Sequence, residues 1–301
     1  MATQRGPRFI RASWRPCLAL LGHDAGMRIL VTGHRGHVGA TVAAHLESLG
    51  HEITGFDRAD GMDLLDLPSV RRAAADCDAI AHLGALAHDT AGPPEQIMAV
   101  NVLGTWHVLL AAEAAGARRV VHFSSAQVFG TAEGEREPDY FPVDDTHPRR
   151  AMRPYGLSKL LAEDLCAGFT ARTGIASISL RPVWVWDPGQ YERTEAQWRA
   201  EPSSEWEPFW EFGAFVDVRD VATATARALT VPLTGHHRIL LCAADIAATA
   251  PALDIAARLA PGVPVRDRAP YRADPWRALV DCSPAESVLG WRPCHRWSGR
   301  L

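Results

Sequence analysis

The sequence lacks the features of a disulfide-stabilised or membrane-spanning protein. Its six cysteines never form a CxxC pair, and several lie inside apolar runs, where a free thiol packs as a small hydrophobic group. This pattern argues against a disulfide framework and indicates a reducing cytoplasm. No apolar run approaches the roughly 20 residues of a membrane span. The sequence therefore predicts a soluble, cytoplasmic protein.

A basic stripe and a metal-binding motif are absent too. The formal net charge is -4, with acidic and basic residues mixed along the chain, which disfavours a nucleic-acid partner. Thirteen histidines are present, yet no HExxH occurs among them. We therefore expect no nucleic acid, no membrane and no metal.

The sequence contains enough apolar residues for a large core, since 47% of its 301 residues are hydrophobic. Residues 1–26 are rich in Arg and poor in acid, which fits a targeting segment or a start codon placed too far upstream. We prefer the second interpretation and expect a disordered extension. Residues 27–182 are predicted to form a nucleotide-binding domain. Residues 183–301 are predicted to form a substrate-binding subdomain, interleaved with the last strands and helices of that domain.

Short apolar runs alternate with helical patterns from Arg28 onward, which predicts βαβ units and a doubly wound parallel sheet of the α/β class. The residues from Val183 to Phe215 are rich in Trp, Pro and Glu without clean periodicity, so we assign them to the subdomain. Strands are predicted at 28–32, 51–57, 79–85, 118–125, 175–182 and 236–243, and helices at 36–48, 94–115, 154–172 and 245–260.

The run TGHRGHVG lies between the first strand and the first helix. Its glycines permit a tight turn and let backbone N–H groups approach a pyrophosphate. Asp57 closes the second strand about twenty residues later, where a carboxylate binds the ribose hydroxyls of NAD. That context favours a Rossmann-type dinucleotide site over a turn that serves packing alone. The cofactor contacts predicted here are Gly33, Arg35, Gly36, His37, Val38, Gly39, Asp57 and Arg58.

Asp57 also bears on the choice of cofactor. A carboxylate at this place repels the 2′-phosphate of NADP and accepts hydrogen bonds from a free diol, so NAD is favoured. Arg35 and Arg58 are the counter-argument, because either guanidinium could clamp a phosphate. NADP therefore stays open as an alternative.

The run YGLSK places Tyr155 and Lys159 at i and i+4, on one face of a helix. A nearby ammonium lowers the pKa of a phenol and makes it a better base. An isolated YxxxK would be read as an ordinary exposed pair. Here SSAQVFG, with Ser125, stands at the end of the fourth strand, where catalytic side chains of open α/β sheets collect.

The motif order resembles the extended short-chain dehydrogenases/reductases, the NAD-dependent epimerase/dehydratase family. The resemblance covers Met27 to about Pro293. It rests on TGHRGHVG, AHLGA, NVLGT, RRVVHFSSAQVFG, YGLSK, SLRP and VLGWRP.

This resemblance implies that Ser125 hydrogen-bonds the reacting oxygen, that Tyr155 is the acid/base, and that Lys159 also binds the nicotinamide ribose. It implies that Asn101 is a structural helper in the cofactor domain. Asp63 resembles the acidic residue near the adenine, with a helix-capping aspartate as the alternative. The resemblance also implies a homodimer that packs the two long helices, 95–115 and 155–172, into a four-helix bundle. Further cofactor contacts are assigned to Leu83, Gly84 and Ala85 of AHLGA.

Departures from the family pattern narrow the chemistry. The Asp-Glu pair of sugar-nucleotide 4,6-dehydratases is replaced by Ala126 and Gln127, which disfavours dehydration. An asparagine that helps many epimerases to bind a diphosphate is replaced by Trp184, which puts a nucleotide-sugar substrate in doubt. Ser125, Gln127 and Trp184 are the predicted substrate contacts. A set of aromatic residues after the fifth strand could line a substrate pocket or form a small hydrophobic core of the subdomain. This aromatic group consists of Trp184, Trp186, Trp198, Trp206, Phe209, Trp210 and Phe212.

The function expected is hydride transfer at a secondary alcohol or ketone of a sugar or other small hydroxylated metabolite. An epimerase that oxidises its substrate transiently is the alternative. A cofactor-sensing protein without catalysis is disfavoured, because Ser125, Tyr155 and Lys159 are all intact. Asp220 of FVDVRDVA is expected to cap a helix rather than to act as a catalyst.

Overall fold

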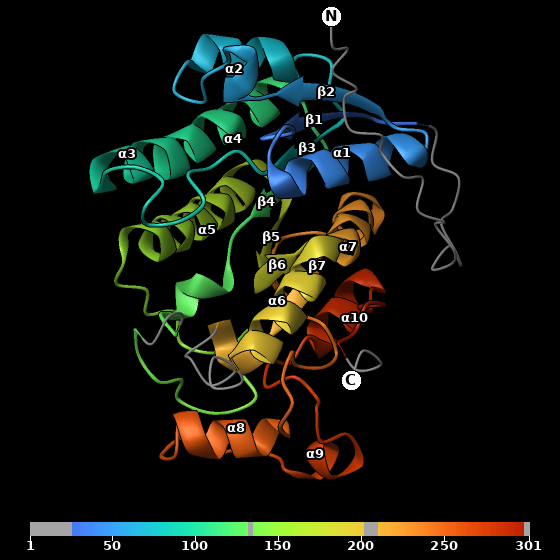
Figure 1. The fold of residues 1–301 in the computed structure, drawn as a ribbon. Helices are drawn as coiled ribbons and strands as arrows, with labels where there is room; N and C mark the ends of the chain where they lie inside the picture. Colours follow the sequence, from blue (N-terminus) through green and yellow to red (C-terminus); the bar gives the residue numbers. More distant parts are fainter. Residues whose placement is uncertain (1–25, 132–134, 202–209, 298–301) are drawn as a thin grey trace, which may run out of the picture.

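A computed structural model describes residues 26–131, 135–201 and 210–297 of the chain (Figure 1). Its centre is a six-stranded sheet of order β2-β1-β3-β4-β5-β8, in which every neighbouring pair is parallel. The predicted doubly wound α/β fold is confirmed. The extension predicted at 1–26 lies outside the described residues except for Gly26. The strands are β1 Arg28–Thr32, β2 Glu52–Phe56, β3 Ala79–His82, β4 Arg119–Phe123, β5 Ala176–Pro182 and β8 His236–Leu241.

Strand β1 illustrates why helices cover both faces of the sheet. Ile29 and Val31 belong to a buried cluster with α1 and α7, whereas Leu30 belongs to a second cluster with α2, α4 and α5. A parallel sheet buried on both sides needs such continuous apolar strands. Figure 1 shows the two helix layers. These helices are α1 His37–Ser48, α2 Leu67–Ala74, α3 Pro94–Met98, α4 Gly104–Ala115, α5 Pro154–Thr173 and α7 Val218–Thr230.

The helix predicted at 94–115 contains a wider turn. Between α3 and α4, residues Ala99–Leu103 form π-helix, a feature that often accompanies functional sites. Both long helices end as predicted, because Gly116 and Gly174 adopt left-handed φ angles of 66° and 76°.

Among the described residues, helix Pro94–Ala115 is long and apolar enough to cross a membrane by length and composition alone. The apolar runs of the sequence do not predict such a segment. However, 44% of the apolar window is buried inside the fold, and core helices of soluble proteins pass the same test. One helix of this kind is weak support for a membrane span.

After β5 the chain forms a two-stranded parallel sheet of β6 and β7 and further helices, together termed the smaller lobe. The segment without clean periodicity contains a helix that the sequence analysis does not predict, α6, whose cap is Asp187 and whose first residue is Pro188. The helix expected at 245–260 begins only after Pro251, because a proline ring is not accommodated inside a helix. The remaining elements are β6 Trp184–Trp186, α6 Pro188–Ala200, β7 Phe215–Asp217, α8 Ala252–Leu259, α9 Ala269–Ala273 and α10 Ser283–Leu289.

Asp220 is not the cap of α7. The side chain of Asp217 accepts a hydrogen bond from the backbone N–H of Arg219 and caps the helix instead. Asp220 lies inside the first turn, where its Oδ2 accepts from the backbone N–H groups of Cys294 and His295 at 3.0 and 2.9 Å. Its role in the structure is to attach the C-terminal segment to α7.

Candidate active site

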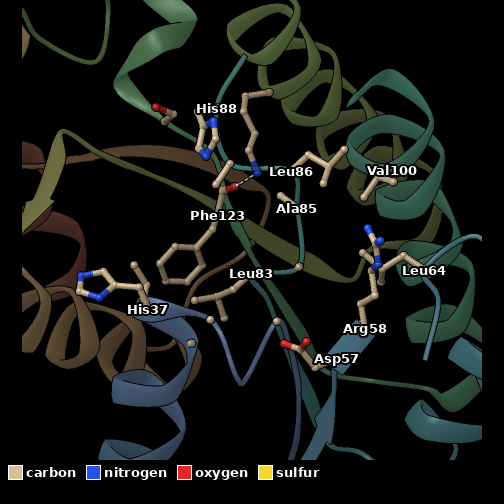
Figure 2. A pocket seen from close by; sticks show the side chains of 18 of the residues that line it. His37, Asp57, Arg58, Leu64, Leu83, Ala85, Leu86, His88, Val100 and Phe123 are labelled. Atoms are coloured by element: carbon tan, nitrogen blue, oxygen red, sulfur yellow. Dashed lines mark hydrogen bonds between the residues drawn. The ribbon is translucent and has the colours of Figure 1, made fainter. Parts of the chain in front are cut away.

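A cleft of about 1010 Å³ opens at the carboxyl ends of β1 to β5 (Figure 2). This is the place where open α/β sheets bind their ligands. The loops after all five strands contribute to it, together with α5. The cleft brings together every predicted site residue except Asn101: Gly33, Arg35, Gly36, His37, Val38, Gly39, Asp57, Arg58, Asp63, Leu83, Gly84, Ala85, Ser125, Gln127, Tyr155, Lys159 and Trp184.

Close backbone contacts explain two glycines of the first loop. Gly33 has φ 71°, and a Cβ there would lie 2.8 Å from the backbone N of Gly84. A Cβ on Gly39 would lie 2.0 Å from the carbonyl O of Gly33. Helix α1 then starts at His37 without a side-chain cap. Its first N–H groups therefore remain free to bind an anion such as a pyrophosphate.

Asp57 is fixed at the end of β2. Its Oδ2 accepts from the backbone N–H of Arg35 at 3.0 Å, and its Oδ1 accepts from that of Ala59 at 2.9 Å. Asp63 also lies at this end of the cleft and accepts from the backbone N–H of Leu65. The capping alternative for Asp63 is wrong, because Asp66 caps α2.

Three hydrogen bonds hold the loop after β3. The Gly84 N–H donates to Thr32 Oγ1 at 3.0 Å. Asn101 accepts from the Leu86 N–H at 2.8 Å and donates to the Leu86 carbonyl at 3.0 Å. Asn101 is 1% exposed and does not line the cleft. It therefore supports the loop from behind.

Tyr155, on the first turn of α5, lines the cleft together with Ser125, which follows β4. Burial raises the pKa of Tyr155 to about 12, the Ser125 hydroxyl opposes this rise by favouring the phenolate, and the carboxylate of Asp89 adds to it. Asp89 also accepts from the Tyr155 backbone N–H at 2.7 Å. The lowering of the phenol pKa expected from the Lys159 ammonium is therefore absent: burial raises the pKa, and the influence that lowers it comes from Ser125.

Lys159 lies one turn further along α5. Its Nζ donates to the carbonyl O of Phe123 at 2.7 Å, the dashed line in Figure 2, and lies 5.7 Å from the Tyr155 ring centroid. Burial lowers the pKa of Lys159 to about 8, against the opposing influence of Cys166 and Glu163. Its amine is thus largely protonated at neutral pH.

Glu163 does not line the cleft but supports it through Ser124, and the sequence did not predict this role. It is fully buried one further turn along α5 and receives two bonds from Arg181, at 2.7 Å from Nε and 2.8 Å from Nη2. The Ser124 hydroxyl donates to the same carboxylate at 2.6 Å, which fixes the first serine of the pair. In the sequence, the i, i+4, i+8 spacing of Tyr155, Lys159 and Glu163 could have placed Glu163 on the same face of the helix as the other two.

The aromatic group divides between the cleft and the lobe core. Trp186 is buried with Tyr191, Phe215 and Trp297, and Trp198 packs on Trp297 with ring centroids 5.1 Å apart. Trp184 lies at the edge of this cluster and lines the cleft. Phe212 contacts Phe141 in the main core, 4.8 Å between centroids. Trp206, Phe209 and the Trp210 side chain lie outside the described residues.

This fold and cleft define a Rossmann-type dinucleotide-binding protein. The model of the NAD-dependent epimerase/dehydratase family matches residues 29–243. The chain belongs to this family, and the resemblance to extended short-chain dehydrogenases/reductases is confirmed. NAD, the cofactor of the family, is the dinucleotide that Asp57 favours.

Several characterised proteins are similar in sequence. A UDP-glucose 4-epimerase of Streptomyces lividans is 32% identical over 172 residues, 51% of this chain and 50% of that protein. A uronate dehydrogenase of Pseudomonas syringae pv. tomato is 28% identical, covering 69% of this chain and 72% of its own length. A UDP-glucose 4-epimerase of Corynebacterium glutamicum is 26% identical, with 89% and 92% covered. The alignment thus spans half of the first relative and nearly all of the third.

Solved structures share the fold. A short-chain dehydrogenase/reductase superfamily protein of Agrobacterium tumefaciens with bound NAD superposes with a TM-score of 0.65 at 25% identity, covering 90% of this chain and 93% of that one. MoeE5 in complex with UDP-glucuronic acid and NAD gives a TM-score of 0.66 at 23% identity, with 89% and 94% covered. The family match and the sequence relatives together show that the chain is an NAD-dependent enzyme of the extended short-chain dehydrogenase/reductase type.

Proposed function

We propose that this enzyme transfers a hydride between NAD and a secondary alcohol or ketone of a sugar or other small hydroxylated metabolite. Ser125, Tyr155 and Lys159 are the proposed catalytic residues. The observation that carries the proposal is the placement of Ser125, Tyr155 and Lys159 together in the cleft that begins at the glycine loop. The sugar epimerases and uronate dehydrogenase among the relatives support the substrate class.

The cleft suits a dinucleotide because its glycines leave no room for a Cβ beside the loop backbone. The first turn of α1 would hold the pyrophosphate, and Asp57 the ribose diol. When bound, NAD supplies the hydride acceptor. Tyr155 takes the hydroxyl proton or returns it, while Ser125 orients the reacting oxygen. Proton transfer of this kind typically contributes about 10²- to 10⁴-fold, and positioning in the cleft contributes the rest.

A dehydrogenase and an epimerase use the same proton and hydride steps, and a panel assay separates them. Purified enzyme is incubated with NAD and sugars, uronates or nucleotide sugars. Net NADH identifies a dehydrogenase, the outcome we expect. An inverted product without net NADH identifies the epimerase alternative. If neither forms with any substrate although NAD binds, the cofactor-sensing alternative replaces the proposal.

Trp184 is proposed to contact the substrate, since it follows β5 and lines the cleft. Replacing Trp184 by Ala should raise KM about tenfold, equivalent to about 1.4 kcal/mol, with NAD affinity unchanged. Trp198→Ala is the matched control, because Trp198 packs in the lobe core and its loss should lower Tm with little effect on KM. If Trp184→Ala lowers only Tm, Trp184 is part of the core and not a substrate contact.

A second copy of this chain is the proposed partner of an exposed apolar hollow between the long helix Pro94–Ala115, mainly its π-helical turn, and α5. Leu103 and Leu161 are 45% and 39% exposed there. We expect a dimer built from these helices, and Leu103→Glu should convert it to monomer in light scattering. Met152→Glu is the control, since Met152 is 63% exposed but lies outside the hollow. A wild-type monomer at micromolar concentration would contradict this assembly. The hollow is lined by Met98, Ala99, Val102, Leu103, Trp106, Leu161 and Leu165.

A further inference from the structure

Beside Asp57, a second aspartate holds the arginine that could otherwise bind a 2′-phosphate. The Nε of Arg35 donates to both carboxylate oxygens of Asp60, at 2.7 and 2.8 Å, and its Nη2 lies 2.6 Å from Oδ1. Arg35 belongs to the glycine loop and Asp60 to the short 3₁₀ turn Arg58–Asp60 after β2. Two elements that border the adenosine end of the cleft are thus joined by one forked ion pair.

Neighbouring residues fix Asp60 in this position. Its backbone N–H donates to the Asp57 carbonyl at 3.0 Å, which closes the turn. The imidazole Nε2 of His34 lies 3.3 Å from Asp60 Oδ2. His34 can occupy this place because position 55 is glycine, where a Cβ would lie 2.6 Å from the imidazole ring. Asp60 therefore binds Arg35 from a position set by β2 and the glycine loop together.

The opposite charges of Arg35 and Asp60 stabilise this ion pair. The bond and charge of Asp60 raise the pKa of Arg35, and those of Arg35 lower the pKa of Asp60. Isolated surface ion pairs contribute little, but a bidentate guanidinium–carboxylate pair has the favourable geometry. The other nearby cation, Arg58, extends toward Leu64 and Val100 (Figure 2). Arg35 is thus the guanidinium whose Nε and Nη2 are already bound to a carboxylate.

We propose that Asp60 is a specificity-determining residue, which keeps the site selective for NAD by binding the guanidinium that would otherwise clamp the 2′-phosphate of NADP. This inference rests on the proposed NAD site. A guanidinium binds a carboxylate and a phosphate with the same fork of donors, so the two compete for Arg35. Asp57 repels the phosphate directly, whereas Asp60 acts by binding the Arg35 guanidinium that would otherwise pair with the phosphate.

The test is calorimetric binding of NAD and NADP to wild type, Asp60→Asn, Arg35→Ala and the double variant. Asp60→Asn keeps the shape of the side chain and removes its charge. We expect NADP affinity to rise about tenfold in Asp60→Asn, because freed Arg35 donors form charge-assisted bonds to the phosphate. The rise should be absent in the double variant. Asp60→Ser, which removes the same charge by a different side chain, should reproduce the single-variant result.

Two outcomes would overturn the inference while leaving the proposed function intact. One is unchanged NADP affinity in both Asp60 variants. The other is an equal rise in the presence and absence of Arg35, which would mean that Asp60 acts only through its own charge. Salt is an internal check, because the gain should shrink as ionic strength screens an exposed contact. If wild type fails to bind NAD, the proposed function and this inference fail together.

Discussion

Tyr155→Phe should lower kcat by about two to four orders of magnitude and leave the Kd for NAD nearly unchanged. The hydroxyl is proposed to serve only proton transfer, whereas the ring still packs in the buried site. Steady-state kinetics on the substrate found in the panel, together with calorimetric NAD binding, measure both quantities. Turnover near the wild-type value would remove Tyr155 from the mechanism.

Glu163→Ala should produce the largest loss of stability, about 3 to 5 kcal/mol in urea unfolding. The substitution leaves Arg181, whose side chain is 1% exposed, without the carboxylate that its Nε and Nη2 bind, and with only the more distant Asp145 carboxylate, 3.7 Å from Nη1. Arg149→Ala is the control. Arg149 meets Glu163 at 3.4 Å from a side chain that is 27% exposed, and its loss should change stability by less than about 1 kcal/mol. Equal losses in the two variants would contradict the buried pair.

The same carboxylate predicts how stability depends on pH. Burial raises the pKa of Glu163, but the bonds and charges of Arg181, with Ser124 and Arg238, outweigh burial and lower it below 4.5. A depressed pKa contributes stability above the unfolded value, and this contribution is lost as the pH falls through the folded value. Acid unfolding should therefore begin below about pH 4.5 in wild type, and Glu163→Ala should have lost this part of its pH dependence.

Local patterns were sufficient to predict the sheet and most of the cleft. Buried parallel strands read as apolar runs, and Gly116 and Gly174 mark helix ends through a backbone angle that other residues rarely adopt. Because loops after successive parallel strands meet at one edge, the glycine loop, Asp57 and Ser125 could be placed in one cleft without the structure.

The features that sequence reasoning missed depend on contacts between distant segments. Glu163 pairs with Arg181 from the next strand, and its spacing from Tyr155 and Lys159 places it on their helix face without showing the cation that it binds. Arg35 reads as a free phosphate ligand until the fold places Asp60 against it. In the smaller lobe, α6 has little apolar periodicity, because only Tyr191 and Thr194 among its described residues are buried.

Tracing the hydrogen of the reacting carbon tests the central claim, hydride transfer, most directly. The substrate is labelled with deuterium at its carbinol carbon, and product and cofactor are analysed by mass spectrometry. We predict that wild type passes the label to the nicotinamide of NADH, or returns it to the inverted carbon if the enzyme is an epimerase, and that Tyr155→Phe does so far more slowly. Loss of the label to water would mean that the carbon gives up a proton instead of a hydride, and would contradict the account.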